Sequence, residues 1–434
     1  VETSGSRILV DCGLFQGLKK LREKNWRELP MSPGEIDAVV LTHAHIDHTG
    51  YLPAFVKKGY TGPIYCTQAT RELLGIMLPD AGYLQEEEAR YANRASYTKH
   101  DPAKPLYTRE DAEDALEQLR SVQFAEDFEP ADGITCRLDR AGHILGAGWL
   151  ALEAEGTRLA FSGDVGRPND ILMHPPHSVR SCDYLVCEST YGNRRHASTS
   201  PWVELADVIR RTVERGGVTI IPAFAVGRSQ TLMHMIATLI KGEQIPDVPV
   251  YLNSPMAVSV TDIYLNHMRG HRLTRPQVRE MCAEVEFVNS VEESKRLNGL
   301  DSPAVIISAS GMATGGRVVH HLKSYLPEAK HTVLFAGFQA AGTRGEAMLS
   351  GVGEIKIHGE YIPVRAEVVE LGGLSAHADY VEIGDWLQEV EEAPEQVFLT
   401  HGEPAAADAM RRYLRDRFGW DCYLPDLEQT VTLE

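Results

Sequence analysis

The stretch "LTHAHIDHTG" at residues 41–50 carries three histidines and one aspartate within six positions, directly after the apolar run "AVVL". Imidazole nitrogens suit zinc, and a carboxylate oxygen beside them suits a second divalent ion. His43 and His45 are one residue apart at a predicted strand end, so both rings can face one point. Asp47 and His48 lie on the next turn and can reach a second point. A solvated, metal-free histidine loop is the alternative, but H-x-H-x-D-H is far more specific than a generic histidine cluster.

Two kinds of predicted element position these residues. Short strands bordered by turn residues are predicted at both ends of the chain, as in "RILVDCG", "IDAVVLTH", "RLAFSGD" and "QVFLTHG". Between the early strands, residues 68–122 are polar and helix-rich, and their acidic run is typical of a solvated helix face. In the middle third, "VTIIPAF", "PVYLN", "AVIISAS" and "TVLFAGF" alternate with helical stretches, which predicts a parallel sheet covered on both faces. We expect the first domain to resume at residue 353, with the strands "EIKIHG" and "RAEVVEL".

Composition sets limits on these elements. A chain of 434 residues with 43% hydrophobic and 24% charged residues is typical of a globular protein with two domains. No apolar run approaches the roughly 18 residues of a spanning helix, and the start shows no signal peptide, so we expect no membrane and a cytoplasmic protein. The chain opens without methionine and inside a predicted strand, so we expect further residues upstream. Seven scattered cysteines without a CxxC pair argue against disulfides and a thiolate zinc site.

The net charge of −18 is uneven along the chain. Residues 191–350 contain 17 basic and 14 acidic residues, a balance of +3, whereas the rest carries −21. The middle third is therefore the part suited to a polyanion. Some of the negative charge elsewhere belongs to the candidate metal ligands, whose cations would offset it.

Three further motifs lie outside the histidine stretch. They are His143 in "AGHILGAGW", Asp164 in "FSGDVG" and, upstream of the stretch, Asp11 in "LVDCG". Together they resemble the metallo-β-lactamase superfamily, in which the histidine is a ligand, the later aspartate bridges two metals and the early aspartate supports a ligand from behind. A lone histidine or aspartate is more often a surface or capping residue, but four matches in the expected order make coincidence an unsatisfactory explanation.

The middle third and three more residues resemble one branch of that superfamily, the β-CASP nucleases. "VCESTYG" supplies Glu188 before the insertion, and "GGLSAHADY" and "FLTHGEP" supply His377 and His401 after it. DNA-processing relatives typically lack the last histidine, so its presence favours RNA. The set is most similar to the bacterial and archaeal relatives of the endonuclease subunit of the cleavage and polyadenylation machinery. RNase J is similar too, but carries an extra C-terminal domain for which no residues remain.

The resemblance implies an α/β fold class: an αββα metallo-β-lactamase sandwich interrupted by an inserted, Rossmann-like β-CASP domain. It implies residues 1–193 and 353–434 for the sandwich and 194–352 for the insertion. It also implies two zinc ions, held by His43, His45 and His143, by Asp47, His48 and His401, and by Asp164 as the bridge. His377 is then the candidate general acid, oriented by Glu188, for which a plain salt bridge is the alternative. Asp47, Asp164, Glu188 and His377 form the expected catalytic set, with Asp11 behind the ligands.

Three glycine turns of the middle third are candidate phosphate sites, because backbone N–H groups and a helix start favour an anion. The candidate residues, with Gly227 in the first turn, are Arg228, Ser229, Ser308, Ser310, Gly311, Arg317 and Arg344. Each motif alone is weak, since glycine turns occur at any strand-to-helix junction. His234, His320 and His358 are expected to be structural or surface residues.

These features predict a zinc-dependent ribonuclease that cuts RNA phosphodiester bonds as an endonuclease, with 5′–3′ exonuclease activity left open. Single-stranded RNA is the expected substrate. Three alternatives remain: a small-molecule hydrolase such as a lactonase or thioesterase, a DNA-processing β-CASP nuclease, and a non-catalytic scaffold subunit, although such scaffolds usually lose ligands. The RNA target, the balance of cleavage modes and assembly as a homodimer are not decided by the residues.

Overall fold

The computed structural model describes residues 1–95, 100–197 and 199–433. The described chain divides into two compact units. The first comprises Val1–Asn169, Met173–Arg195 and His377–Glu434, and the second comprises Asp170–Leu172 and His196–Ala376. The second unit is thus an insertion into the first. No helix among the described residues is both long and apolar enough to cross a membrane.

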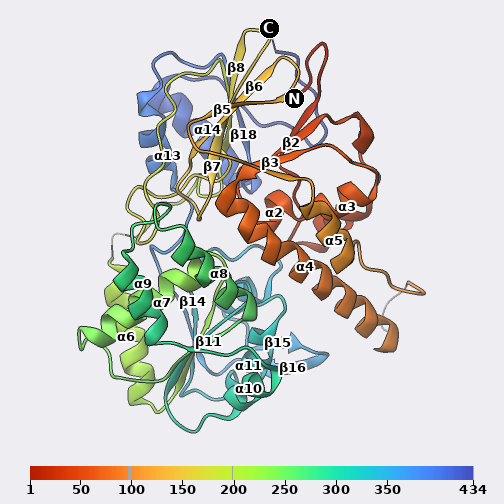
Figure 1. The fold of residues 1–434 in the computed structure, drawn as a ribbon. Coiled ribbons are helices and arrows are strands. Elements are labelled where there is room, and N and C mark those ends of the chain that lie inside the picture. The colour runs from red at the N-terminus through yellow and green to blue at the C-terminus, as the bar shows by residue number, and fades with distance from the viewer. Residues whose placement is uncertain (96–99, 198, 434) are drawn as a thin grey trace. The chain divides into compact units, whose positions relative to one another are not determined.

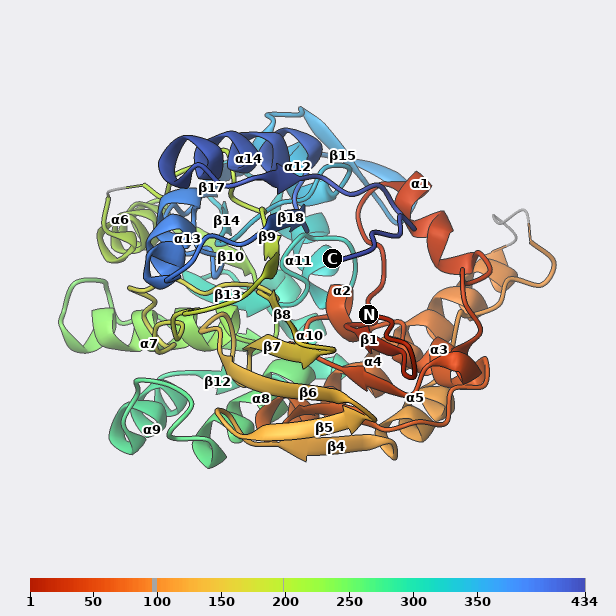
Figure 2. The ribbon, with the colours of Figure 1, turned by 90° about the horizontal axis from the view of Figure 1, so that it is seen from above.

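Two β-sheets form the first unit (Figure 1). One is parallel, in the order β1 (Ile8–Val10), β2 (Ala38–Val40), β3 (Ile64–Thr67) and β4 (Leu119–Val122). The other has the order β19-β18-β9-β8-β7-β6-β5. Its antiparallel part is β5 (Asp127–Ala131), β6 (Ile134–Arg140), β7 (Gly148–Ala154) and β8 (Thr157–Phe161), and Figure 2 shows β5, β6 and β7 side by side. Parallel strands follow, β9 (Tyr184–Glu188), β18 (Gln396–Thr400) and β19 (Cys422–Tyr423).

The core of the first unit lies between these sheets. Ile8, Ala38 and Val40 from the parallel sheet pack with alternate residues of β6 and β7, such as Leu138 and Leu150. Alternation places one face of each sheet in this core, because successive side chains of a strand point to opposite faces. The packing buries the strand from which the histidine stretch emerges.

Helices cover the outer faces. The parallel sheet is covered by α4 (Gln68–Ala95), which contacts β3 and β4, with α3 (Leu52–Lys57) and α5 (Arg109–Leu116) beside it (Figure 1). The other sheet is covered by α14 (Pro404–Phe418), which contacts β18 and β19, and by α13 (Tyr380–Trp386) with the turn η4 (Leu387–Glu389). Short turns complete the unit: α1 (Lys19–Arg22), η1 (Glu23–Trp26), η2 (Pro33–Glu35) and α2 (Ile46–Thr49). The predicted αββα sandwich is confirmed.

The second unit contains an all-parallel sheet in the order β12-β11-β13-β10-β14-β17. The strands are β10 (Val218–Pro222), β11 (Val250–Asn253), β12 (Glu286–Phe287), β13 (Ala304–Ser308), β14 (Thr332–Phe335) and β17 (Glu367–Glu370), with the hairpin β15 (Glu354–Ile357) and β16 (Glu360–Pro363) apart. The helices are α6 (Pro201–Glu214), α7 (Arg228–Lys241), α8 (Pro255–Asn266), α9 (Arg275–Ala283), α10 (Val291–Arg296), η3 (Leu297–Gly299), α11 (Arg317–Tyr325) and α12 (Arg344–Leu349).

Helices cover both faces of this sheet, as predicted. Thr332 of β14 lies 2.7 Å from the hydroxyl of Thr212 in α6, whereas its neighbour Val333 packs in the core cluster that contains α11. Because neighbouring residues of a strand point to opposite faces, α6 and α11 lie on opposite sides of the sheet. This confirms the inserted α/β domain.

One local expectation differs from the structure. The strands at residues 354–370 were expected in the first domain, but β17 pairs with β14, so the chain rejoins the first unit only at His377. A strand pattern predicts extended structure, but it does not predict the sheet in which the strand pairs.

Candidate metal centre

The histidine stretch lies where β2 ends and α2 begins. β2 is buried throughout, and the chain leaves it at Leu41 and reaches His43, whose side chain is fully buried. His45 immediately precedes the four-residue helix α2, which contains Asp47 and His48. A strand end followed at once by a helical turn sends the first two imidazoles and the last two ligands in different directions.

The opposite sheet supplies two more side chains. His143 lies in the turn between β6 and β7, and Asp164 follows β8. Gly163, next to Asp164, has φ +52°, and a Cβ there would lie 2.7 Å from the Cβ of Thr42. Only glycine allows this loop to come so close to the histidine stretch.

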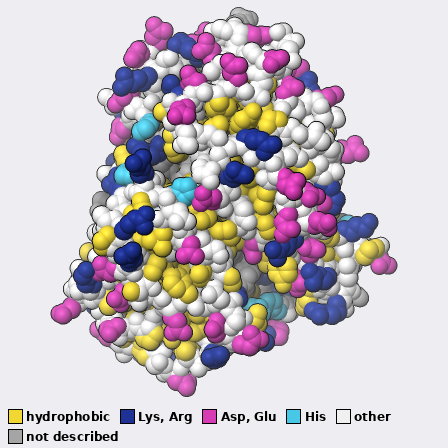
Figure 3. Space-filling view, in the orientation of Figure 1, with side chains coloured by type: hydrophobic (Ala, Val, Ile, Leu, Met, Phe, Trp, Pro, Cys, Tyr) yellow, Lys and Arg dark blue, Asp and Glu magenta, His cyan; other side chains and the backbone are white. Residues whose placement is uncertain are grey.

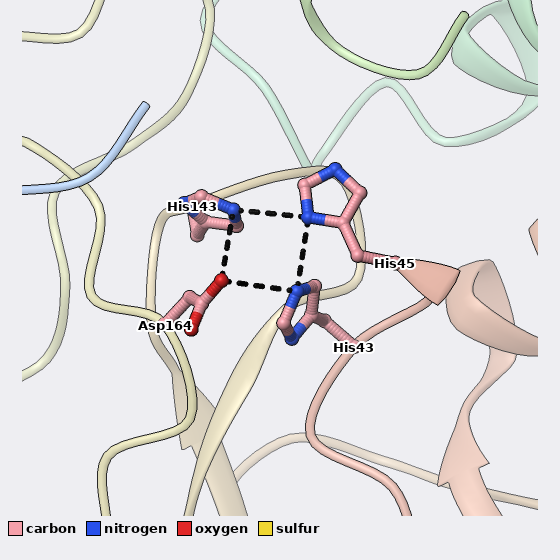
Figure 4. Close-up of side chains that lie close together, drawn as sticks. All are labelled: His43, His45, His143 and Asp164. Atoms are coloured by element: carbon pink, nitrogen blue, oxygen red, sulfur yellow. Dashed lines mark hydrogen bonds and ion pairs between the residues drawn. The ribbon is translucent and has the colours of Figure 1, made fainter. Parts of the chain in front are cut away.

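Four of these side chains converge on one point (Figure 4). Nδ1 of His45 lies 3.1 Å from Nε2 of His43 and 3.2 Å from Nε2 of His143. Oδ2 of Asp164 lies 3.4 Å from both of those Nε2 atoms. Three imidazole nitrogens and one carboxylate oxygen around one point form a donor set that suits zinc.

A second group lies on the other side of Asp164. Nε2 of His401 is 3.1 Å from Nε2 of His48 and 3.4 Å from Oδ2 of Asp47. Oδ1 of Asp164 lies 3.3 Å from Nε2 of His48 and 3.4 Å from Nδ1 of His401. One carboxylate therefore presents one oxygen to each group, the arrangement expected of a bridging ligand. The Asp47 and His401 side chains are 39% and 27% exposed, so a substrate can approach from this side.

The charges of the centre favour cations. Burial alone would raise the pKa of Asp164, but the imidazoles of His401 and His48 hold it well below its usual range. Burial would lower the pKa of His48, yet Asp164 and Asp11 raise it well above normal. In the other group, burial lowers the pKa of His45 to about 3. The low pKa of His45 keeps its ring neutral, so a metal binding there displaces no proton from it, whereas the raised pKa of His48 reflects the attraction of two carboxylates for positive charge.

Two buried atoms test whether these residues fit metal ions. Oδ1 of Asp164 and Nδ1 of His143 have no hydrogen-bond partner among the described residues. A buried carboxylate oxygen without a hydrogen bond is costly. This oxygen faces ring nitrogens of His48 and His401 at 3.3 and 3.4 Å, so a cation bound among the three residues would satisfy it. The donor set and this oxygen both fit divalent cations.

Residues behind the ligands hold two rings in place. Oδ2 of Asp11 lies 2.7 Å from Nδ1 of His48 and accepts a hydrogen bond from the hydroxyl of Thr42. The hydroxyl of Thr190 lies 3.0 Å from Nδ1 of His401. Such contacts orient imidazole ligands. Asp11 was expected from its motif, whereas the two threonines were missed, because a threonine beside a motif carries no signal of its own.

His377 and Glu188 meet beside the centre. Nδ1 of His377 lies 3.2 Å from each carboxylate oxygen of Glu188, which is buried and also accepts a hydrogen bond from the Val165 N–H. The ring centroid of His377 is 4.5 Å from that of His143. Burial would lower the pKa of His377, but Glu188 and Asp164 raise it. The structure thus pairs the two residues as expected and keeps the imidazole suited to hold a proton.

The predicted phosphate residues of the second unit lie where strands hand over to helices. Arg228 and Arg344 begin α7 and α12, Arg317 begins α11, and Ser308 ends β13. The hydroxyls of Ser229, Ser308 and Ser310 already contact nearby groups: Ser229 donates to the Phe224 carbonyl, Ser308 to the Asn253 carbonyl, and Ser310 accepts from the Thr314 N–H. Gly311 packs against Phe224, where a Cβ would come within 2.8 Å.

The guanidinium groups of Arg317 and Arg344 are engaged with the chain itself. Arg317 donates to the carbonyls of Val288 and Asn289, and Arg344 to those of Ala313 and Thr314. These bonds hold the loops that follow β12 and β13. Phosphate binding by the seven predicted residues stays a prediction. The hydrogen bonds of Arg317 and Arg344 show that these two side chains stabilise loops of the second unit.

Comparison with known families agrees with this geometry. Residues 1–222 match the metallo-beta-lactamase superfamily, residues 229–348 the Beta-Casp domain, and residues 361–425 the Zn-dependent metallo-hydrolase RNA specificity domain. The chain belongs to the metallo-β-lactamase superfamily, in the branch that carries a β-CASP domain. The predicted family is confirmed.

Three relatives show how far the likeness extends. Ribonuclease TTHA0252 of Thermus thermophilus is 34% identical over 94% of this chain and 91% of its own length. The RNase J-like protein of Methanocaldococcus jannaschii is 30% identical over 93% of this chain and 88% of its own. Transcription termination factor FttA of the same organism is 30% identical over 96% of this chain and 67% of its own.

Proposed function

We propose that this protein is a metal-dependent ribonuclease that hydrolyses phosphodiester bonds of single-stranded RNA. The observation that carries the proposal is Asp164, which presents one oxygen to each of two ligand groups. The His377–Glu188 pair beside them adds a proton donor that simple metallohydrolases do not need. Relatives named ribonuclease and RNase J-like, together with the match to an RNA specificity domain, support RNA as the substrate.

Two zinc ions are the proposed cofactors. His43, His45 and His143 would hold one, Asp47, His48 and His401 the other, and Asp164 both. When bound, such ions activate a water molecule and offset the negative charge of a phosphate under attack. The carboxylate of Asp47 and the ring of His401 would lie on the side that a substrate reaches.

The protein's own residues supply the proton for the departing ribose oxygen. Glu188 and Asp164 raise the pKa of the His377 imidazole, which favours its protonated form, and Glu188 fixes the ring through Nδ1. A positioned donor of this kind contributes roughly 10²–10⁴-fold to the rate. Endonucleolytic and 5′–3′ exonucleolytic cutting both hydrolyse a phosphodiester bond, so the same residues would serve either mode.

The cell compartment follows from the proposed substrate. We place the protein in the cytoplasm, where RNA is processed and degraded, and keep a homodimer as a proposal. Figure 3 shows acidic and basic side chains interspersed on one face, so the net charge of −18 forms no single acidic area there. Basic side chains can therefore contact the phosphates of RNA locally, although the protein as a whole is negatively charged.

A substrate panel tests the function. Metal-loaded protein is expected to cut single-stranded RNA much faster than DNA of the same sequence, and to leave a β-lactam, a lactone and a thioester essentially intact. The readout is the initial rate on each substrate in one preparation. A DNA rate equal to the RNA rate would favour the DNA-processing branch, and fast lactone or thioester hydrolysis without RNA cleavage would make the protein a small-molecule hydrolase.

A further inference from the structure

A short segment after β1 differs in composition from the rest of the chain. Residues 14–28, here called the basic loop, contain five basic and two acidic residues, a balance of +3 in a protein of charge −18. Its helical turns α1 and η1 bury no residue. Three large apolar side chains are exposed on it: Trp26 at 58%, Leu18 at 50% and Phe15 at 38%. Single exposed apolar residues are common, but three among basic residues of one short loop are not.

Hydrogen bonds close the loop at its base. The Phe15 N–H donates to the side-chain oxygen of Asn25, and the Asn25 amide donates to the Phe15 carbonyl, both at 2.9 Å. This clasp brings the two ends of the loop together. Trp26 follows Asn25 directly, so both aromatic residues belong to the base of the loop.

The base of the loop lies against the metal centre. The Cys12 N–H donates to the His48 carbonyl and the Leu14 N–H to the Ile46 carbonyl, at 2.6 and 3.0 Å. Between them, Gly13 is so close to Asp47 that a Cβ would lie 1.5 Å from its carbonyl oxygen. Phe15 follows Leu14 directly, with its Cα about 3.8 Å further along the chain. The aromatic base of the loop therefore adjoins Asp47, the most exposed of the candidate ligands.

Several cations of the loop have no internal counter-ion. Lys20, Arg22 and Arg27 make no salt bridge within the part of the chain that the structure describes, whereas Lys19 pairs loosely with Glu23. Lys24 lies 5.1 Å from the ring centroid of Phe15. Lys58, directly after α3, adds an ammonium group beside the Arg27 carbonyl, 3.5 Å away. Solvated cations next to exposed rings suit a ligand that carries both phosphates and planar bases.

We propose that the basic loop binds the single-stranded RNA substrate next to the metal centre, with bases stacked on Trp26 and Phe15 and phosphates paired with Lys20, Arg22 and Arg27. This proposal rests on the proposed ribonuclease function. An acidic protein partner could use the cations, but it would not need flat rings at the edge of the site. The combination of rings, cations and metal ligands favours a nucleic acid strand.

The test compares cleavage of single-stranded RNA with hydrolysis of bis(p-nitrophenyl) phosphate, a substrate too small to reach the loop. Trp26→Ala is expected to raise KM for RNA by roughly 5- to 150-fold, the worth of one stacked base, at little change in kcat. The triple variant Lys20→Gln/Arg22→Gln/Arg27→Gln is expected to flatten the dependence of log(kcat/KM) on log[salt] by about two units, at about 0.7 per phosphate of a single strand. Hydrolysis of the small substrate should stay unchanged in both variants.

Tyr91→Ala is the matched control. Tyr91 is 48% exposed and has Arg94 over its ring, so it resembles the aromatic residues of the basic loop. It lies on α4, 23 residues from Gln68 at the start of that helix, which is about 34 Å at the helical rise. It should keep the parent KM. If the parent cuts RNA and both loop variants keep its KM and salt slope, the loop is not the RNA surface, although the ribonuclease function stands. Equal loss on the small substrate would also overturn the proposal, because the loop would then act by supporting Asp47. Absence of RNA cleavage by the parent would overturn both proposals.

Discussion

Asp164→Ala is expected to lose bound metal and RNA cleavage together. The variant removes the carboxylate that presents one oxygen to each ligand group, leaving His43, His143, His48 and His401 without their shared anion. Metal stabilisation of charge in such reactions is worth several kcal/mol, so the rate should fall by at least about 10³-fold. Metal content by mass spectrometry and the initial cleavage rate, taken on the same sample, check both parts.

A control variant at a second buried aspartate separates loss of metal from a general loss of stability. Asp139, at the end of β6, is also buried and forms ion pairs with Arg137 and His177, outside the candidate ligands. Asp139→Ala is expected to lower stability while metal content and rate per folded molecule stay near the parent values. An Asp164→Ala protein that keeps both its metal and its activity would show that Asp164 is not the bridge.

His377→Ala is expected to keep its metal and to lose rate by roughly 10²–10⁴-fold, the range for a general acid. The structure places the ring against Glu188 rather than within either ligand group. An RNA in which sulfur replaces the bridging oxygen that departs, a phosphorothiolate, needs no protonation of its leaving group, so the variant should cut it nearly as well as the parent does.

Two further variants sharpen this prediction. Glu188→Gln keeps the shape of the side chain but removes its charge, and it should reproduce part of the loss. His358→Ala removes an exposed histidine of the second unit and should change nothing at the centre. Loss of metal from His377→Ala, or an equal loss of rate on both RNA substrates, would remove His377 from the role of proton donor.

Strand-end geometry alone predicted that the rings of His43 and His45 face one point. The resemblance to a known family added His143 and His401, which lie far from that stretch in the sequence. The left-handed backbone of His401, with φ +60°, shows no such sequence signal. Thr42 and Thr190 support imidazoles by side-chain contacts that depend on sub-ångström placement, which residue types alone do not give.

Strand pairing and side-chain direction depend on tertiary packing, and at two places they differ from what the sequence predicted. Strand patterns around residues 354–370 predict β-structure, but β15 and β16 pair with each other and β17 pairs with β14 of the inserted sheet. Such pairing over a distance depends on the tertiary fold. Arg317 and Arg344 stand beside glycine turns, as phosphate-binding residues do, yet their donors reach backbone carbonyls. The direction of a long side chain depends on the loop around it.

Metal bound at this centre is expected to drive RNA hydrolysis, and a zinc titration tests this dependence most directly. Protein freed of metal by a chelator and then dialysed should cut no single-stranded RNA. Cleavage should rise as zinc is added and level off near two ions per chain, because seven ligand residues form two groups around Asp164. Cleavage of RNA at the full rate by the metal-free protein, or no cleavage at any zinc content, would contradict the account.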